Sequence, residues 1–421
     1  MIYELGKWLQ DLDFAGARLL HYVSFRAICA FVLALLISTW IGGYIIKALR
    51  QKEIGETIRD LGLEGQQSKR NTPTMGGIII IIALLVPTVL FARMDNVYII
   101  VMLITIFFMG IIGFVDDYIK VFRKNKSGLS PKYKLIGQIT TGLAVGLILY
   151  LAPSVTIREN SEFYNQDIKR IERVEFSRDE TKSTKTTIPF VKNNNFDYVD
   201  LIPEGVPHRT MWGWILYIVI IILIVTFISN CVNLTDGLDG LASGTSAPVG
   251  VVLLVLAYVS SHISLASYLN IMFIPGTEEL VIFGASFVGA TLGFLWFNGY
   301  PAQVFMGDTG SLVLGGIIAT FAIIIRKELL LPIMAGIFII EGLSSLLQQG
   351  FYKLSRKLTG TPRRIFKMAP LHHHLQKVGD PSIEALIKVP RQTIPESKVT
   401  IRFILIAIIL AALSIGTLKM R

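Results

Sequence analysis

Long apolar runs separated by short polar segments dominate the pattern of this chain. The runs lie near residues 27–47, 75–92, 97–115, 135–152, 212–229, 241–259, 280–297, 310–325, 329–350 and 401–418. A helix needs about 20 apolar residues to cross the ~30 Å hydrocarbon core of a bilayer. Backbone groups at that depth must be hydrogen-bonded internally, so such runs predict helices. The pattern predicts an all-α, polytopic integral membrane protein with about ten transmembrane helices, the eighth of them short.

Composition supports a bilayer as the solvent for much of the surface. Of the 421 residues, 52% are hydrophobic and 17% are charged, whereas soluble domains carry about 25% charged residues. The two cysteines, Cys29 and Cys231, lie in or beside apolar runs and offer neither a disulfide framework nor metal-ligand spacing. We therefore expect a single transmembrane domain, 1–421, rather than several soluble domains.

The distribution of positive charge predicts the orientation. Segments 48–74, 116–134 and 351–400 are dense in Lys and Arg, whereas segments 93–96, 260–279 and 326–328 carry few. Cytoplasmic loops carry an excess of Lys and Arg, so the basic segments are predicted to be cytoplasmic and both termini external. The net charge of +10 fits such loops better than nucleic-acid binding.

One polar segment, 153–211, then lies outside as a loop insertion. It is rich in Lys, Glu, Thr and Asn. Long loops translocate largely regardless of their charge, so its Lys and Arg residues do not contradict the predicted topology. Its mixed-charge composition favours a small appendage or partial disorder.

A pair of adjacent carboxylates, Asp116 and Asp117, closes the third apolar run. If the helix ends there, its macrodipole disfavours negative charge. We therefore expect a compensating cation, either a metal ion or the following Lys120 and Lys124. Such a pair could also supply a general base. The alternative is that both carboxylates are ordinary solvated charges.

The stretch Thr72–Gly77 opens the second run, with Lys69 and Arg70 just before it. Thr72 can cap a helix, and Pro73 suits the first helical position, where no N–H is needed. One interpretation is simply a good helix start. The other is an anion site, in which free N–H groups at the helix end bind a phosphate.

Two further motifs carry aspartates. In Asn233–Gly240, Asp236 and Asp239 are three residues apart and share a face if the turn is helical. They either cap a helix or act as hard oxygen ligands for Mg²⁺. Asp308 precedes the eighth run and is either an N-cap or a member of the same acidic group.

The segment 351–400 is a predicted cytoplasmic loop that contains His372-His373-His374. Three adjacent imidazoles cannot easily chelate one tetrahedral ion. They fit a phosphate or diphosphate grip better, with a solvated polar loop as the alternative. Glu341 is the main charged residue deep within an apolar run. It either pairs with a polar neighbour in the bundle or has a functional role.

All these motifs are predicted to lie on one face of the membrane. Helix ends that bind anions, beside carboxylates of the kind that bind Mg²⁺, are the ingredients of phosphoryl transfer. No G-x-x-x-x-G-K-[ST] loop occurs, which argues against P-loop ATP hydrolysis. An ion-coupled transporter is the alternative from another class, but it is expected to carry ionisable groups near the bilayer midplane.

In these motifs the chain resembles the polyprenyl-phosphate N-acetylhexosamine-1-phosphate transferase superfamily. The matching stretches are Thr72–Gly77, Gly113–Tyr118, Asn233–Ala242, Pro301–Leu312, Met368–His374 and the ending Lys398–Arg421. Asp-Asp and Asn-x-x-Asp-Gly-x-Asp-Gly mark the superfamily. Ala-Pro-Leu-His-His-His and Thr-Pro-Thr-Met-Gly-Gly look like its muramoyl-pentapeptide branch. A sister transferase that uses UDP-N-acetylglucosamine is the nearest alternative.

The resemblance implies the substrates UDP-N-acetylmuramoyl-pentapeptide and undecaprenyl phosphate, with Mg²⁺ as cofactor. It implies lipid I and UMP as products, a bacterial inner-membrane location with a cytoplasmic active site, and a possible homodimer. Asp308 would bind Mg²⁺, and Asp116 would deprotonate or orient the lipid phosphate with support from Asp117. The implied substrate-binding residues are Lys69, Thr74, Lys132, Asn233, Asp236, Asp239, Asn298, Phe305, His372, His373 and His374.

Within that set, Phe305 would stack on uridine, and the histidines would line the phosphate or sugar-peptide side. Direct attack by the lipid phosphate is the favoured mechanism. A two-step route through a phosphorylated Asp308 or Asp116 is the competitor. The segments 153–211 and 375–397 look longer than is usual for the family, without interrupting a motif.

Overall fold

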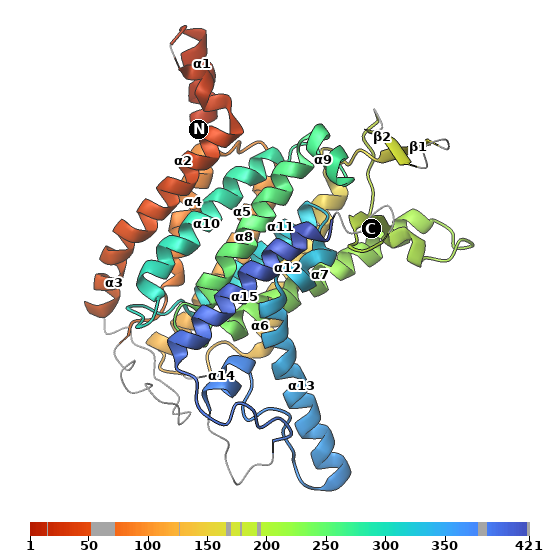
Figure 1. Cartoon of the computed structure of the whole chain (residues 1–421). Coiled ribbons are helices and arrows are strands. Elements are labelled where there is room, and N and C mark those ends of the chain that lie inside the picture. Colours follow the sequence, from red (N-terminus) through yellow and green to blue (C-terminus); the bar gives the residue numbers. More distant parts are fainter. Residues whose placement is uncertain are drawn as a thin grey trace.

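The computed structural model describes residues 1–14, 16–51, 72–125, 127–165, 170–176, 179–191, 195–377 and 385–418, and helices dominate it (Figure 1). The helices are α1 (Ile2–Asp11), α2 (Val23–Leu36), α3 (Gly42–Gln51), α4 (Gly77–Phe91), α5 (Val97–Phe122), α6 (Pro131–Leu151), α7 (Arg209–Thr235), α8 (Leu241–Ser260), α9 (Ile263–Leu269), α10 (Glu278–Asn298), α11 (Gly307–Ile324), α12 (Leu331–Met334), α13 (Gly336–Thr359), α14 (Leu371–Gln376) and α15 (Glu396–Gly416). Short 3₁₀ or π turns are η1 (Ala17–His21), η2 (Ile37–Ile41), η4 (Tyr198–Leu201) and η5 (Glu328–Leu330).

Among the described residues, eight helical stretches are long and apolar enough to cross a bilayer. The first is continuous over Val23–Gln51, through α2, η2 and α3, and the others are α5, α6, α7, α8, α10, α11 and α15. The bent pair α12–α13 could be a ninth, and α4 is apolar but has only 15 residues. The predicted class, a helical protein with many membrane spans, is confirmed. The count of ten stays a prediction.

Two predicted runs end differently from expectation. The run 329–350 is not one straight span, because α13 is bent by 84° from the preceding η5 and α12. Proline cannot donate to a preceding turn, and Pro332 lies in the first turn of the separate short helix α12. The run 97–115 continues as α5 to Phe122, where Tyr118 stacks on Phe122 at 4.8 Å.

Close helix packing centres on α11, of which 89% is buried. Gly77 of α4 lies directly against Gly310 of α11, since a Cβ on Gly77 would fall 2.1 Å from the Gly310 nitrogen. A Cβ on Gly113 of α5 would fall 2.4 Å from the carbonyl oxygen of Asp308. Small residues let helices in a membrane approach this closely. These glycines bring α4 and α5 into backbone contact with the first turn of α11.

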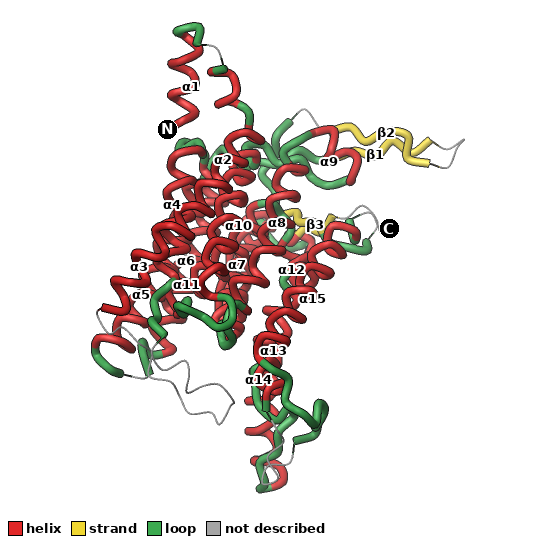
Figure 2. The backbone as a smooth tube through the Cα atoms, turned by 60° about the vertical axis from the view of Figure 1, so that its left-hand side comes forward, coloured by secondary structure: helices red, strands yellow, loops and turns green. Residues whose placement is uncertain are grey.

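The segment 153–211 contains strands, which the sequence did not predict. Strands β1 (Asn160–Asn165) and β2 (Arg170–Phe176) form one antiparallel pair, and β3 (Lys185–Thr187) and β4 (Asn195–Asp197) form another (Figure 2). β3 is attached to the end of α11, because the Thr187 N–H donates to the Arg326 carbonyl at 3.0 Å. The fold is therefore helical with two small sheets, rather than all-α throughout.

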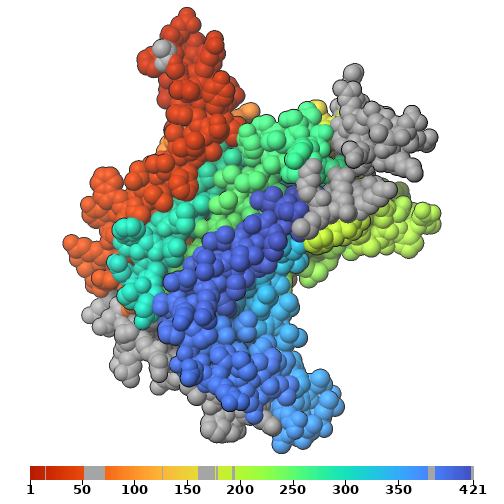
Figure 3. All heavy atoms as spheres, in the orientation of Figure 1, coloured from red at the N-terminus to blue at the C-terminus, as the bar shows by residue number. Residues whose placement is uncertain are grey.

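The motif-bearing segments gather at one end of the bundle. The loops before α4, α6, α8 and α11 lie at the same end as α14, whereas α9, β1 and β2 lie at the other end (Figures 1 and 2). α1 and the last turn of α15 also point toward that other end. The lower part of α13, with α14, forms a lobe that projects beyond the bundle (Figure 3).

We predict that Gly77→Ala lowers the unfolding free energy by about 1–3 kcal/mol, because its methyl group overlaps the backbone of Gly310. Thermal unfolding of the detergent-purified protein, followed by tryptophan fluorescence, measures this. Gly350→Ala in α13 is the matched control, since nothing lies within 4 Å of its added Cβ. Equal midpoints for the two variants would contradict the packing argument.

Candidate active site

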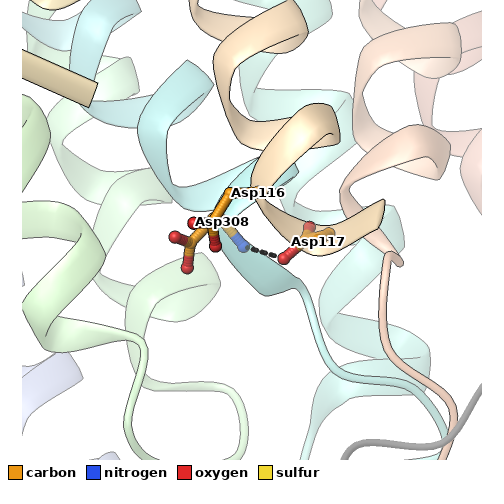
Figure 4. Close-up of side chains that lie close together, drawn as sticks. All are labelled: Asp116, Asp117 and Asp308. Carbon is orange, nitrogen blue, oxygen red and sulfur yellow. Dashed lines mark hydrogen bonds between the residues drawn. The ribbon is translucent and has the colours of Figure 1, made fainter. Parts of the chain in front are cut away.

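The first turn of α11 is capped by a carboxylate from another helix. Asp117 of α5 accepts hydrogen bonds from the backbone N–H groups of Asp308 (3.0 Å) and Thr309 (2.9 Å) and from the Thr309 hydroxyl (2.6 Å). Carboxylates are favourable at a helix N-terminus, where free N–H groups and the macrodipole carry positive charge. Asp117 therefore fixes the start of α11 to α5 and leaves Asp308 beside it (Figure 4).

Two lysines bridge the other two carboxylates. The Lys134 ammonium lies 2.8 Å from Asp116 Oδ1 and 2.5 Å from Asp308 Oδ2. The Lys120 ammonium lies 2.6 Å from Asp116 Oδ2 and 3.1 Å from Asp308 Oδ1. Because Asp116 is fully buried, its charge needs such partners. Asp116 Oδ1 also accepts from the Leu129 N–H at 2.7 Å, which fastens the loop before α6.

The expectation that the Asp116–Asp117 pair closes its helix is wrong. α5 continues to Phe122, so the pair lies more than a turn inside it. The helix continues because Lys120, four residues after Asp116, forms an ion pair with it. The expected cation is therefore present, and it is Lys120. Lys124, the other predicted partner, lies beyond the helix and is exposed.

The three carboxylates could hold a metal ion. One oxygen of each of Asp116, Asp117 and Asp308 lies within 4.8 Å of the others. Carboxylate oxygens are hard ligands, and with two lysines bridging Asp116 and Asp308, cations already occupy this cluster. Since Asp117 is committed to capping α11, Asp308 and Asp116 are the better placed ligands. These carboxylates are suited to a hard divalent cation, and the expectation that Asp308 binds Mg²⁺ stays a prediction.

Asn233 connects the Asn233–Gly240 motif to this centre. Its amide donates to Asp308 Oδ1 at 3.0 Å and to the Ser311 hydroxyl at 2.8 Å. Asp236 follows the last turn of α7 and is partly exposed. Thus α7 brings an amide against the same carboxylate that α11 presents.

Asp239 and Asn298 brace the neighbouring loops. Asp239 Oδ2 accepts from the Ala302 N–H at 2.9 Å. Asn298 accepts from the Gly240 N–H and the Ser243 hydroxyl, and its amide donates to the Val304 carbonyl. Both side chains are buried, at 3% exposure each. They hold the start of α8 against the loop 299–306, which carries Phe305.

The Thr72–Gly77 stretch does not begin a helix at Pro73 as expected. α4 begins at Gly77, after Gly76. The N–H groups of Gly76 and Gly77 donate to the carbonyls of Phe305 and Met306, both at 2.8 Å. The interpretation as a free anion site is therefore wrong for these two groups, because backbone carbonyls occupy them. Thr74 is 5% exposed within this contact, and Phe305 is partly exposed.

The three histidines lie in α14, and each has a different environment. His374 accepts from the Lys367 N–H at Nδ1, so its Nε2 donates to the Val389 carbonyl at 2.8 Å. Burial lowers the pKa of His374, which agrees with this neutral form. His373 is partly exposed and lies 3.3 Å from the Gln376 side-chain oxygen. His372 is fully buried and contacts Glu341.

Sequence reasoning missed the importance of Lys134. Lys134 reaches both Asp116 and Asp308, whereas Lys132 is exposed at the start of α6 and its binding role stays a prediction. Both lysines belong to the basic segment 116–134, and the available signal for Lys134 was its position one turn into a helix that starts at Pro131. Lys69 lies outside the described residues.

The model described as Glycosyl transferase family 4 matches residues 99–326, and phospho-N-acetylmuramoyl-pentapeptide-transferase signature 1 matches residues 69–81. The chain is 62% identical to the phospho-N-acetylmuramoyl-pentapeptide-transferase of Porphyromonas gingivalis, 58% to that of Parabacteroides distasonis and 54% to that of Azobacteroides pseudotrichonymphae. Each alignment covers 100% of both chains. The segments 153–211 and 375–397 are therefore shared with these relatives.

We predict that Asp117→Asn lowers the unfolding free energy by about 0.5–2 kcal/mol, because the helix start of α11 loses a charged cap. Asp95→Asn is the control, since Asp95 is an exposed carboxylate that pairs with Arg93 just before the other end of α5. Thermal unfolding compares the two variants. If Asp117→Asn unfolds at the same temperature as Asp95→Asn, Asp117 does not stabilise α11.

Proposed function

Since the chain belongs to the phospho-N-acetylmuramoyl-pentapeptide-transferase family, we propose that it transfers phospho-N-acetylmuramoyl-pentapeptide from its UDP-linked donor to undecaprenyl phosphate. The products are lipid I and UMP. The observation that carries the proposal is the acidic centre, where Asp116, Asp117 and Asp308 from two helices meet at the motif-bearing end of the bundle. The glucosamine-specific and transporter alternatives have no comparable support.

Each member of the centre has a proposed task. An oxygen of the lipid phosphate attacks the β-phosphorus of the donor, the bond from that phosphorus to the bridging oxygen breaks, and UMP leaves. Asp116 orients the lipid phosphate or takes its proton, while Asp117 holds α11 in place. Lys120 and Lys134 form ion pairs with Asp116 and Asp308 and add positive charge beside the reacting phosphates.

We propose Mg²⁺ as the cofactor, held mainly by Asp308. When bound, it neutralises charge that develops on the departing phosphate. Direct transfer remains the preferred mechanism over a phosphorylated aspartate. Asn233, Lys120 and Lys134 fix the direction of the Asp308 carboxylate at this centre.

The donor is proposed to bind beside the centre. Lys69, Thr74, Asn233, Asp236 and Phe305 line the uridine side, with Phe305 as the stacking residue, and Lys132 faces the solvent. Asp239 and Asn298 act by bracing these loops. The three histidines line the phosphate or sugar-peptide side, His374 by shaping the loop.

We further propose a multi-pass location in the bacterial inner membrane, with the acidic centre facing the cytoplasm and both termini external. The support for this orientation is the Lys and Arg content of segments 116–134 and 351–400, since cytoplasmic loops carry an excess of these residues. A homodimer stays a prediction.

The detergent-purified protein is expected to release UMP from UDP-N-acetylmuramoyl-pentapeptide when undecaprenyl phosphate and Mg²⁺ are present. Asp308→Asn is expected to lower kcat at least about 100-fold, because one charged group at the reacting centre is lost. EDTA should abolish release, and added Mg²⁺ should restore it. Release from UDP-N-acetylglucosamine alone would assign the protein to the sister branch instead.

Lys134→Met is expected to lower kcat about 100-fold, because Asp116 and Asp308 lose one of the two cations that they share. Lys132→Met is the matched comparison, since it changes the same residue type on the same helical turn but on an exposed side chain. Steady-state UMP release measures both. A loss at Lys132 equal to or larger than the loss at Lys134 contradicts the assigned geometry.

A further inference from the structure

A buried carboxylate contacts the histidine cluster from within the bundle. Glu341 lies in the second turn of α13, just after the 84° bend, and is fully buried. Its Oε2 lies 2.9 Å from His372 Nδ1, and its Oε1 accepts from the His372 backbone N–H at 3.1 Å. The expectation that Glu341 pairs with a polar neighbour is thereby confirmed, and the neighbour belongs to the histidine motif.

The position of Glu341 is fixed from two sides. A Cβ on the adjacent Gly342 would fall 2.3 Å from the Cys231 sulfur, so α13 and α7 are in close contact beside the carboxylate. Cys231 lies two residues before Asn233, which donates to Asp308. The packing that places Glu341 therefore involves the helix turn of α7 that carries Asn233.

Glu341 determines which ring nitrogen of His372 points away from the carboxylate. A carboxylate accepts only, so the nitrogen facing it, Nδ1, carries a proton. The other nitrogen, Nε2, is buried and has no hydrogen-bond partner in the described part of the chain. It lies against Gly237, since a Cβ there would fall 2.3 Å from it. Buried polar atoms are almost always hydrogen-bonded, so an unpaired one indicates a missing partner.

The unpaired ring nitrogen distinguishes His372 from His374. Both ring nitrogens of His374 bond to the backbone of its own loop, at Lys367 and Val389. Of these two rings only that of His372 has a nitrogen left over, and that nitrogen is directed at the Asn233–Gly240 loop, where Asp236 lies. Because Gly237 has no side chain, its loop places no Cβ against Nε2.

We propose that Glu341 is a positioning residue that holds His372 so that Nε2 contacts the phosphosugar part of the donor. The proposal rests on the proposed function and names a residue that acts through another. Glu341 fixes the tautomer and the direction of the ring, and the donor supplies the partner that Nε2 lacks. Neither group takes part in bond breaking.

A double-mutant cycle tests the coupling between the two residues. Glu341→Gln and His372→Gln are each expected to raise the KM for UDP-N-acetylmuramoyl-pentapeptide about ten-fold. The KM for undecaprenyl phosphate and the inhibition constant of UMP should stay unchanged, because UMP lacks the N-acetylmuramoyl phosphate part of the donor. The double variant should be no worse than His372→Gln alone. Glu341→Asp, which keeps the carboxylate, should recover part of the loss.

Glu279→Gln is the control for neutralising a buried carboxylate. Glu279 forms a fully buried pair with Arg26, away from the acidic centre. This variant should unfold at a lower temperature without changing the KM for the donor. If Glu341→Gln behaves in the same way, or if its effect multiplies with that of His372→Gln, the positioning role is overturned. Parallel rises in the KM for both substrates would also overturn it.

A second measurement needs no substrate, so it separates failure of this proposal from failure of the proposed function. The chain has six histidines, and the ¹⁵N signals that disappear in His372→Gln belong to His372. They should report a protonated Nδ1, and Glu341→Gln should change that pattern. A neutral ring protonated only at Nε2 in the unmodified protein overturns the proposal even if UMP release is observed.

Discussion

The cap that Asp117 places on α11 is the contact on which the site depends. Without it, the first N–H groups of α11 and the carboxylate of Asp117 would all be buried without partners. With it, the first turn of α11 is held against α5, along which α11 also packs through the Thr105–Thr320 hydrogen bond, and Asp116 and Asp308 are brought within reach of the same two lysines. Gly113 and Gly77 permit this approach because they place no side chain between the helices. The arrangement of the acidic centre therefore follows from the hydrogen bonds that Asp117 accepts at the start of α11.

Much of the fold follows from the sequence because a bilayer restricts what an apolar run can become. Each predicted run is helical, although 329–350 is broken by the bend before α13, and three of the aspartates singled out, Asp116, Asp117 and Asp308, do meet. The bend before α13 was not visible, since Leu331-Pro332-Ile-Met-Ala-Gly336 is apolar on both sides of it. The strands in 153–211 were also missed. Their short lengths and mixed composition carry no clear alternation, and β3 is held by contacts to Arg326.

The site shows the same division between local and distant information. Chemistry-bearing residue types are visible in the sequence, but their partners are 174 to 192 positions away in the pairs Lys134–Asp308 and Asp117–Thr309. The sequence therefore drew attention to Lys132, whereas in the structure it is Lys134 that contacts Asp116 and Asp308. The sequence also suggested free helix ends as anion sites. In the structure, the N–H groups at the start of α4 donate to backbone carbonyls, and those at the start of α11 donate to Asp117. Glu341 was recognised as unusual, but its partner could not be read from spacing.

The long separation between Asp117 and its partner affects how the protein is made. Asp117 enters the nascent chain 192 residues before Thr309, whose N–H donates a hydrogen bond to it. At about 5–20 residues per second, the ribosome needs roughly 10–40 s to synthesise that interval. During this time Asp117 has no helix start to cap, and water, lipid headgroups or the insertion machinery must solvate it. The acidic centre is thus completed late, only once α11 has inserted between helices that are already in the membrane.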